Sequence, residues 1–214
     1  YTTSGLDYSY GPQKKENRLL TLYANYNKLV ESIKSSFDVT AGYDYQYWKS
    51  TTPLYSEMNT LGEIQKTSKA SDERHVLLSY YGRLNYSFNS RYMLTTTVRR
   101  DATSRFAKNV RWGTFPSVAL GWRVTEESFL KDNKVISTLK VRASYGVTGQ
   151  QDGIGNYNYL PIYTISQSGA GSLIGDTPTP TYRPKAYVPN LKWETTISWN
   201  VGFDFGFLKD RITG

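Results

Sequence analysis

Apolar and polar residues alternate with a period of two along most of this chain. In segment 33–50, alternate positions are apolar or aromatic, whereas the positions between them are polar and include Asp38 and Asp44. Successive side chains of a β-strand point to opposite faces, so this pattern predicts a strand with two different faces. The same pattern, least regular in the first segment, predicts six further strands, at 18–30, 75–88, 91–100, 112–124, 137–149 and 190–207.

The connections between these strands alternate in length. Short ones are expected near 31–32, 89–90 and 209–210, and long ones at 50–74, 101–111 and 150–190. Several strands run to roughly 12–17 residues, whereas strands of soluble proteins average about 5–6. Long strands with short turns at one end and long loops at the other are typical of outer-membrane barrels. The sequence therefore predicts an all-β fold, an antiparallel transmembrane β-barrel. The alternative is a secreted β-sandwich that binds glycans, because its strands also alternate.

Seven strands do not readily form a complete barrel. Residues 1–16 are expected to end a long loop, and 210–214 to begin an eighth strand. The connection 125–136 lies at the short-turn end yet is longer. We expect Glu126–Lys131 to form one helical turn capped by Thr125. The chain is therefore interpreted as about 7–8 strands of a larger barrel.

Composition agrees with a barrel wall. Aromatic residues make up 15% of the 214 residues and include 19 tyrosines, while the mean hydropathy is only -0.55. A barrel strand needs apolar residues only where it faces lipid, so a low overall hydropathy is compatible with spanning a membrane. No apolar run reaches the roughly 18 residues of a transmembrane helix. Since no signal peptide opens the chain, we expect further sequence before Tyr1.

Charge and cysteine content change the picture little. The net charge is +8, but Lys and Arg are spread over strands and loops, and no nucleic-acid-binding motif is present. We therefore expect no nucleic-acid partner. Cysteine is absent, and the only histidine, His75, is expected at the surface beside Asp72 and Glu73. Neither catalysis, nor a metal site, nor a cofactor is predicted, because no His/Cys cluster or positioned base is present.

Three blocks resemble the SusC-like branch of the TonB-dependent receptors. The first runs from Arg91-Tyr-Met-Leu to Asp101-Ala-Thr-Ser-Arg105-Phe106 and continues through Arg111-Trp-Gly-Thr-Phe-Pro-Ser. The second is Leu139-Lys-Val-Arg-Ala-Ser-Tyr-Gly146-Val-Thr-Gly149-Gln-Gln-Asp152. The third begins Pro189-Asn-Leu-Lys-Trp193-Glu-Thr-Thr. The resemblance covers roughly residues 75–214.

The resemblance implies a 22-stranded barrel in the bacterial outer membrane with a plug domain in its lumen. It also implies energy delivered by TonB, a SusD-like surface lipoprotein as partner, and import of oligosaccharides or peptides. Residues 1–214 would then be part of the barrel domain, without plug, TonB box or C-terminal strand. A passive porin-type barrel would share the strand pattern but lack TonB coupling.

Candidate residues for contact with cargo lie at the long-loop end. Strand parity directs Arg99 and Asp101 towards the lumen, with Arg105 next in the same block. These charges have a second interpretation, an Arg–Asp network that holds the loop in place. The loop after Gly149 contains Asn156, Tyr157 and Tyr159, and aromatic rings beside amides suit sugar rings. Alternatively, this Tyr-rich loop packs on itself or on the lipoprotein.

Overall fold

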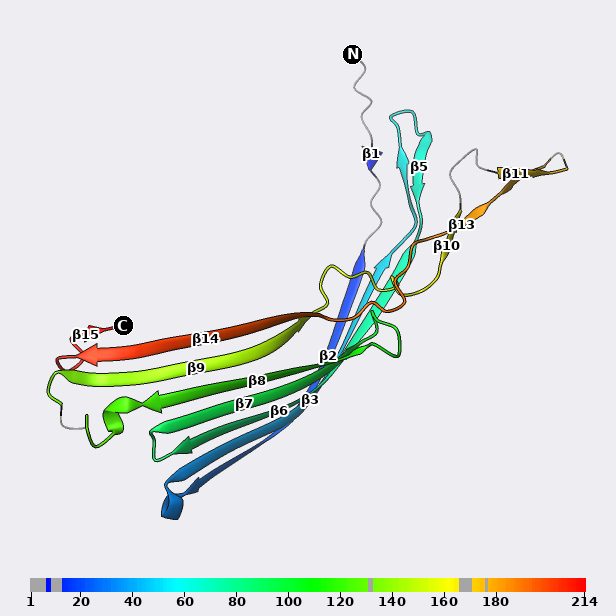
Figure 1. Ribbon diagram of the computed structural model, residues 1–214. Helices are drawn as coiled ribbons and strands as arrows, with labels where there is room; N and C mark the ends of the chain where they lie inside the picture. Colours follow the sequence, from blue (N-terminus) through cyan, green and yellow to red (C-terminus); the bar gives the residue numbers. More distant parts are fainter. Residues whose placement is uncertain (1–6, 9–12, 131–132, 166–170, 176) are drawn as a thin grey trace.

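One antiparallel sheet dominates the computed structural model, which describes residues 7–8, 13–130, 133–165, 171–175 and 177–214. Its eight strands follow the order β15-β14-β9-β8-β7-β6-β3-β2, so each long strand pairs with the long strand before it in the chain (Figure 1). The strands are β2 (Lys14–Val30), β3 (Ser35–Thr52), β6 (Ser71–Phe88), β7 (Tyr92–Thr103), β8 (Trp112–Arg123), β9 (Ile136–Gln150), β14 (Glu194–Phe207) and β15 (Ile212–Thr213). The seven predicted strands and the start of an eighth are confirmed.

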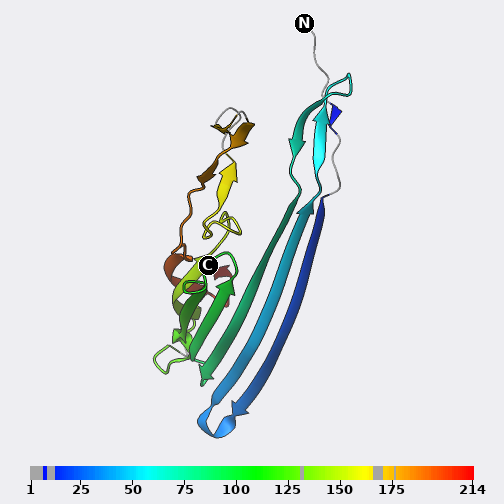
Figure 2. The same ribbon diagram turned by 90° about the vertical axis from the view of Figure 1, so that its right-hand side faces the viewer.

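The sheet is a curved wall that does not close on itself (Figure 2). Strand β2 forms one edge of the sheet, and the two-residue strand β15 forms the other. Strands β2, β3 and β6 are the longest, at 17 or 18 residues, and lie side by side. A partial barrel is thus confirmed as the fold.

The register keeps one face of the wall apolar over most of its length. Leu20 pairs with Tyr45, which in turn pairs with Leu78, and the same parity continues through β7, β8, β9 and β14. We call this side the apolar face and the opposite side the polar face. Side chains of the apolar face are exposed, as Trp199 (75%) and Phe203 (61%) show. A soluble sandwich would cover them, whereas lipid contacts such a face in a barrel.

No second large sheet packs against the wall among the described residues. The other three sheets have two or three strands each and extend beyond the long-loop end (Figure 1). They are formed by β1 (Asp7–Tyr8), β4 (Tyr55–Met58) and β5 (Ile64–Ser68), by β10 (Tyr163–Ile165) and β13 (Tyr182–Pro184), and by β11 (Gly171–Ile174) and β12 (Thr177–Pro180). The sequence predicts loops for these segments, because short hairpins show little alternation of apolar and polar residues.

Tight turns close the opposite end of the wall. Backbone φ is positive at Lys34, Asn89, Ser90 and Leu208–Asp210, the left-handed conformation that reverses the chain within a few residues. The predicted short connections are confirmed. We call this end the short-turn end.

The expected helical turn Glu126–Lys131 with a Thr125 cap is wrong for its described part, up to Leu130, while Lys131 lies outside the described residues. A 3₁₀ helix occupies Val124–Glu126 instead, so Thr125 lies inside it and no side chain caps its start. The Thr125 hydroxyl accepts a hydrogen bond from the backbone N–H of Leu139 at 3.5 Å, which directs it towards β9. Among the described residues, no helix is long and apolar enough to cross a membrane.

Candidate functional site

Arg99 is fixed within a charged network on the polar face. Its Nε donates to both carboxylate oxygens of Asp101, at 2.9 and 3.1 Å, and its Nη2 donates to Ser79 Oγ at 2.8 Å. Asp44 on β3 lies 3.5 Å from the same Nη2. The guanidinium also lies 5.8 Å from the centre of the Tyr81 ring. Arg99 and Asp101 both lie on the polar face, and the network ties together strands β3, β6 and β7; contact of these residues with cargo stays a prediction.

Tyr81 can lie across the polar face because its neighbour on β3 has no side chain. A Cβ on Gly42 would come within 2.2 Å of the Tyr81 ring. The two residues are register partners. Glycine at position 42 therefore makes room for the ring that Arg99 contacts.

Arg105 holds the start of the long loop, at Gln151 and Asn156, beside β6. Its Nε donates to Asn156 Oδ1 at 3.1 Å and its Nη1 to the backbone oxygen of Gln151 at 3.0 Å. Asn156 Nδ2 donates in turn to Glu73 Oε2 at 3.1 Å. Two predicted candidates from different loops, Arg105 and Asn156, thus meet at one point.

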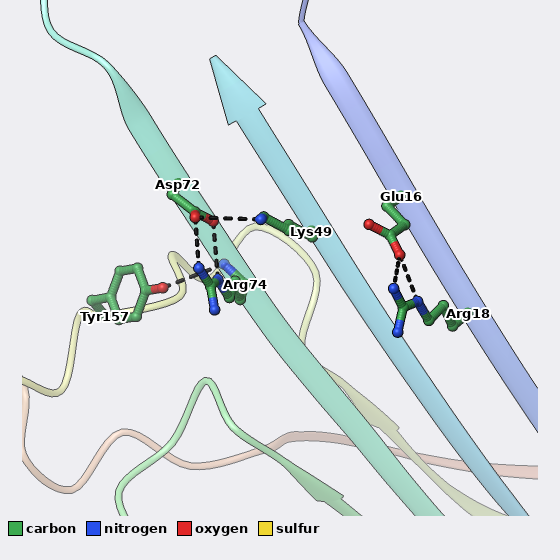
Figure 3. A network of polar contacts seen from close by, with 6 residues as sticks. All are labelled: Glu16, Arg18, Lys49, Asp72, Arg74 and Tyr157. Atoms are coloured by element: carbon green, nitrogen blue, oxygen red, sulfur yellow. Dashed lines mark hydrogen bonds and ion pairs between the residues drawn. The ribbon is translucent and has the colours of Figure 1, made fainter. Parts of the chain in front are cut away.

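Tyr157 also reaches β6, through its hydroxyl rather than its ring. The backbone N–H of Arg74 donates to the Tyr157 hydroxyl at 3.3 Å (Figure 3). Tyr159 is half-buried in the same loop, and no described contact joins it to the Arg105 cluster. The three loop candidates therefore differ: Asn156 and Tyr157 hold the loop on β6, whereas Tyr159 has no such role in this arrangement.

His75 lies in a different environment from the one expected. Rather than standing at the surface, it is half-buried, with its ring stacked on Trp48 at 4.4 Å between ring centres and 15° between planes. Its Nε2 lies 3.4 Å from Arg105 Nη2. Trp48 and Glu73 were missed as site residues, although pairing β3 with β6 in register would have placed Trp48 opposite His75.

A small aromatic core lies beneath these loops. Phe106 (0% exposed), Phe115 and Trp193 (8%) meet edge to face, with ring centres 5.3–5.5 Å apart. Trp193 Nε1 donates to the backbone oxygen of Arg111 at 2.9 Å, which anchors the end of the long loop. A Cβ on Gly149 would lie only 2.0 Å from the Phe115 ring, so glycine at position 149 is what admits that ring.

Charged side chains of three neighbouring strands lie on the side of the apolar face at the long-loop end (Figure 3). Asp72 accepts two bonds from Arg74, at 2.6 and 3.0 Å, and lies 3.5 Å from Lys49 Nζ. Glu16 pairs with Arg18 on the neighbouring strand β2. These charges stand beyond the apolar stretch of each strand, where a membrane protein reaches water.

At the short-turn end, one carboxylate joins three side chains. Glu127 accepts from the Tyr92 hydroxyl at 2.6 Å, Trp122 Nε1 at 3.1 Å and Arg91 Nη1 at 3.2 Å. The bond from Tyr92, followed by that from Trp122 and the charge of Arg91, lowers the pKa of Glu127 below its usual value. Tyr92 and Trp122 also stack with their ring centres 6.5 Å apart. Glu127 therefore orders an aromatic pair beside the turn.

Neither end contains the usual parts of a metal site. Within the described ranges, no three His, Cys, Asp or Glu side chains gather closely enough to hold a metal ion. The polar groups at both ends bond mainly to one another, an arrangement that suits the positioning of chain segments and the recognition of a ligand.

Comparison with known proteins gives a consistent picture. Residues 1–214 match the family model described as TonB dependent receptor-like, beta-barrel. The TonB-dependent receptor SusC of Bacteroides thetaiotaomicron is 46% identical over 205 residues, which is 89% of this chain. Two Formosa agariphila proteins, TonB-dependent receptors P3 and P39, are 38% and 32% identical over 92% and 89% of the chain. These relatives are receptors and not enzymes, in agreement with the expectation that the chain is not catalytic.

The chain spans only part of each of these proteins. It corresponds to 20% of SusC, 20% of P3 and 19% of P39. Among solved structures, the RagAB peptide transporter superposes with a TM-score of 0.78 at 22% identity, over 94% of this chain and 23% of the other. The RagAB peptide importer in its open-open state gives a TM-score of 0.79 at the same identity, over 94% of this chain and 22% of the other. At this identity the likeness concerns the fold.

Proposed function

Since this chain belongs to the TonB dependent receptor-like β-barrel family, we propose that it is a wall segment of a SusC-like outer-membrane transporter. The family match over the whole chain carries this proposal. The exposed apolar face supports it, because a row of exposed Trp, Phe and Ile side chains is stable against lipid and not against water. The polar face then lines the lumen, and the long-loop end faces the cell exterior.

The transporter moves cargo with energy supplied through TonB. Parts of the parent protein that this chain does not include, the plug domain and the TonB box, carry that coupling in our proposal. The Arg99 network and the Arg105 cluster give the wall a rigid polar lining. Such a lining suits a pathway for hydrophilic cargo, because it offers polar groups whose charges are already paired.

The cargo in this proposal is an oligosaccharide. Side chains with aromatic rings, amides and carboxylates lie together near the mouth, and this mixture matches the C–H faces and hydroxyls of sugars. Peptides are the second candidate, because the superposed RagAB structures are described as peptide transporters and importers. An uptake experiment distinguishes between oligosaccharide and peptide as the cargo.

A surface lipoprotein is the proposed partner at the long-loop end. The hairpins that extend beyond the wall expose large apolar side chains, among them Leu61 (81%) in the turn between β4 and β5 and Leu173 (73%) on β11. Exposed apolar groups on protruding hairpins are typical of a surface that a second protein covers. A SusD-like lipoprotein above the barrel mouth would meet these hairpins first.

Uptake in cells that carry the whole protein tests the proposal. We expect accumulation of an oligosaccharide against a gradient, its loss when TonB is deleted or the membrane potential is collapsed, and co-purification of the lipoprotein. Accumulation that persists without TonB and stops at the external concentration would identify a passive porin. Accumulation of peptides alone would reassign the cargo.

A further inference from the structure

Three neighbouring strands turn six side chains towards one hollow at the long-loop end of the polar face. Asn17, Trp48 and His75 are register partners across β2, β3 and β6, and Lys15, Ser50 and Glu73 form the next row. Together with Glu16 and Lys49 of the same strands, and with Arg105 and Asn156 from the loops, they line a hollow of about 400 Å³. This volume falls in the range of roughly 300–1,000 Å³ that small-molecule sites occupy.

The indole of Trp48 lines this hollow and is held on one side by an aromatic contact. One of its faces is stacked on His75, whose other contact is with Arg105. Arg105 is in turn held by Asn156 and Gln151. The opposite face of the indole lies on the side of its other register partner, the exposed Asn17 on β2, and a ring already supported on one face loses little freedom when a ligand binds beside it.

The polar groups around the indole supply both donors and acceptors. Glu73 uses one carboxylate oxygen, Oε2, to accept from Asn156, and carries a second acceptor oxygen. Lys15 and Ser50 add an ammonium and a hydroxyl on the neighbouring strands. A sugar ring requires this combination, since its C–H groups meet the negative face of an aromatic ring while its hydroxyls donate and accept in the ring plane.

Other ligand classes fit the hollow less well. An anionic phosphate would meet the Glu73 carboxylate beside the cations, and the Arg105 guanidinium already donates to three partners. An apolar ligand would leave Glu73, Lys15 and Ser50 without water. A neutral sugar satisfies the aromatic surface and the polar rim together.

We propose that this hollow is a sugar-binding subsite in which Trp48 is the stacking platform and Glu73 and Lys15 bond the hydroxyls of a neutral hexose unit. The proposal rests on the proposed transport function and assigns its cargo class to defined residues. Asn156 and Arg105 act as positioning residues, because they hold Glu73 and His75 rather than the ligand.

Binding by the whole purified protein in detergent tests the subsite. The probes are a glycan array of neutral oligosaccharides and a decapeptide library, followed by calorimetric titration of the strongest binder. We expect an oligosaccharide to bind, W48A to weaken that binding about tenfold, and W48F to retain most of it. Lys15→Ala should weaken binding about threefold. Trp199→Ala, on the apolar face, should bind like the parent, and heat-modifiable migration in gels verifies that each variant is folded.

The outcomes separate this inference from the transport function. If no oligosaccharide binds, if only a peptide binds, or if folded W48A and parent bind an oligosaccharide equally, the subsite is wrong. TonB-dependent uptake in cells is measured in parallel with the same variants. If uptake depends on TonB and W48A binds the oligosaccharide as well as the parent does, the transport function stands and the sugar binds at another site.

Discussion

The two ends of this wall solve the same problem, the reversal of the chain, in different ways. At the short-turn end, a few residues with positive φ reverse β2 into β3, β6 into β7 and β14 into β15. At the long-loop end, segments of up to several tens of residues leave the sheet and return. Those segments have a polar anchor at Arg105, and their residues Phe106 and Trp193 form an aromatic core with Phe115 of β8.

The difference shows where recognition can be placed. A tight turn is fixed by local backbone geometry and offers few side chains beyond the sheet. A long loop must bury apolar surface and pair its polar groups to be ordered, and in doing so it brings distant residues together. The Arg105–Asn156–Glu73 contacts join three segments far apart in sequence, which no tight turn could do.

Removing the aromatic core should have the largest effect, confined to the long-loop end. Trp193→Ala deletes a side chain that is 8% exposed and packed on two Phe rings, a change that typically costs about 3–5 kcal/mol. We expect loop 151–193 to be cleaved much faster by protease added to intact cells, while the wall stays folded.

Trp199→Ala is the matched control, because it removes the same side chain from the exposed apolar face. It should leave the rate of loop cleavage unchanged. Equal protease resistance of W193A and the parent would show that the aromatic core does not order the loop.

A smaller effect should follow from filling the space beside that core. Gly149→Ala places a Cβ about where the Phe115 ring lies, at 2.0 Å, and such overpacking costs about 1–3 kcal/mol. Gly82→Ala is the control, since no atom lies within 4 Å of its added Cβ. We expect thermal unfolding of G149A, and not of G82A, at a lower temperature.

Adding Phe115→Leu to G149A should recover part of the loss, because the smaller side chain leaves room for the new methyl group. If G149A unfolds at the same temperature as G82A, the close packing of Phe115 on position 149 is refuted.

The smallest expected effect concerns the short-turn end. Glu127→Gln removes the charge that three donors share. Because the pKa of Glu127 is lowered in the fold, its charged form stabilises the fold above its usual pKa of 4.5, and that contribution is lost as the pH falls through the lowered value. The melting temperatures of parent and E127Q should therefore differ at neutral pH and converge in acid.

Glu126→Gln is the neighbouring control, an exposed residue without a described side-chain contact. It should melt like the parent at every pH. If the difference in melting temperature between E127Q and the parent stays constant from neutral to acid pH, the three donors do not act by stabilising the Glu127 charge.

Sequence alone predicts the wall well and the loops poorly. Alternation of apolar and polar residues predicts where the strands are and which face each residue occupies, and hairpin connections predict the strand order. The common face of Arg99 and Asp101 therefore follows directly from their positions. The family resemblance, based on three long blocks, agrees with the family match. Strand starts were less accurate, because β6 begins at Ser71, before its apolar alternation starts.

The remainder depends on contacts between distant segments. Sequence spacing does not show that Arg105 meets Asn156, or that Trp48 stacks on His75, because loop closure and strand register together decide both. The Thr125 cap failed for a related reason: its hydroxyl bonds to β9 rather than to its own turn. Local rules describe a side chain only while tertiary partners do not compete for it.

The central claim, a wall with one lipid face and one water-filled face, is tested most directly by cysteine accessibility along β14. The chain contains no cysteine, so single substitutions at Ile197, Trp199 and Val201, and at Ser198 and Asn200, report one position each. In the whole protein in outer membranes, a water-soluble thiol reagent should label positions 198 and 200 and spare 197, 199 and 201. Labelling without alternation, or labelling of the apolar positions alone, would contradict the barrel wall.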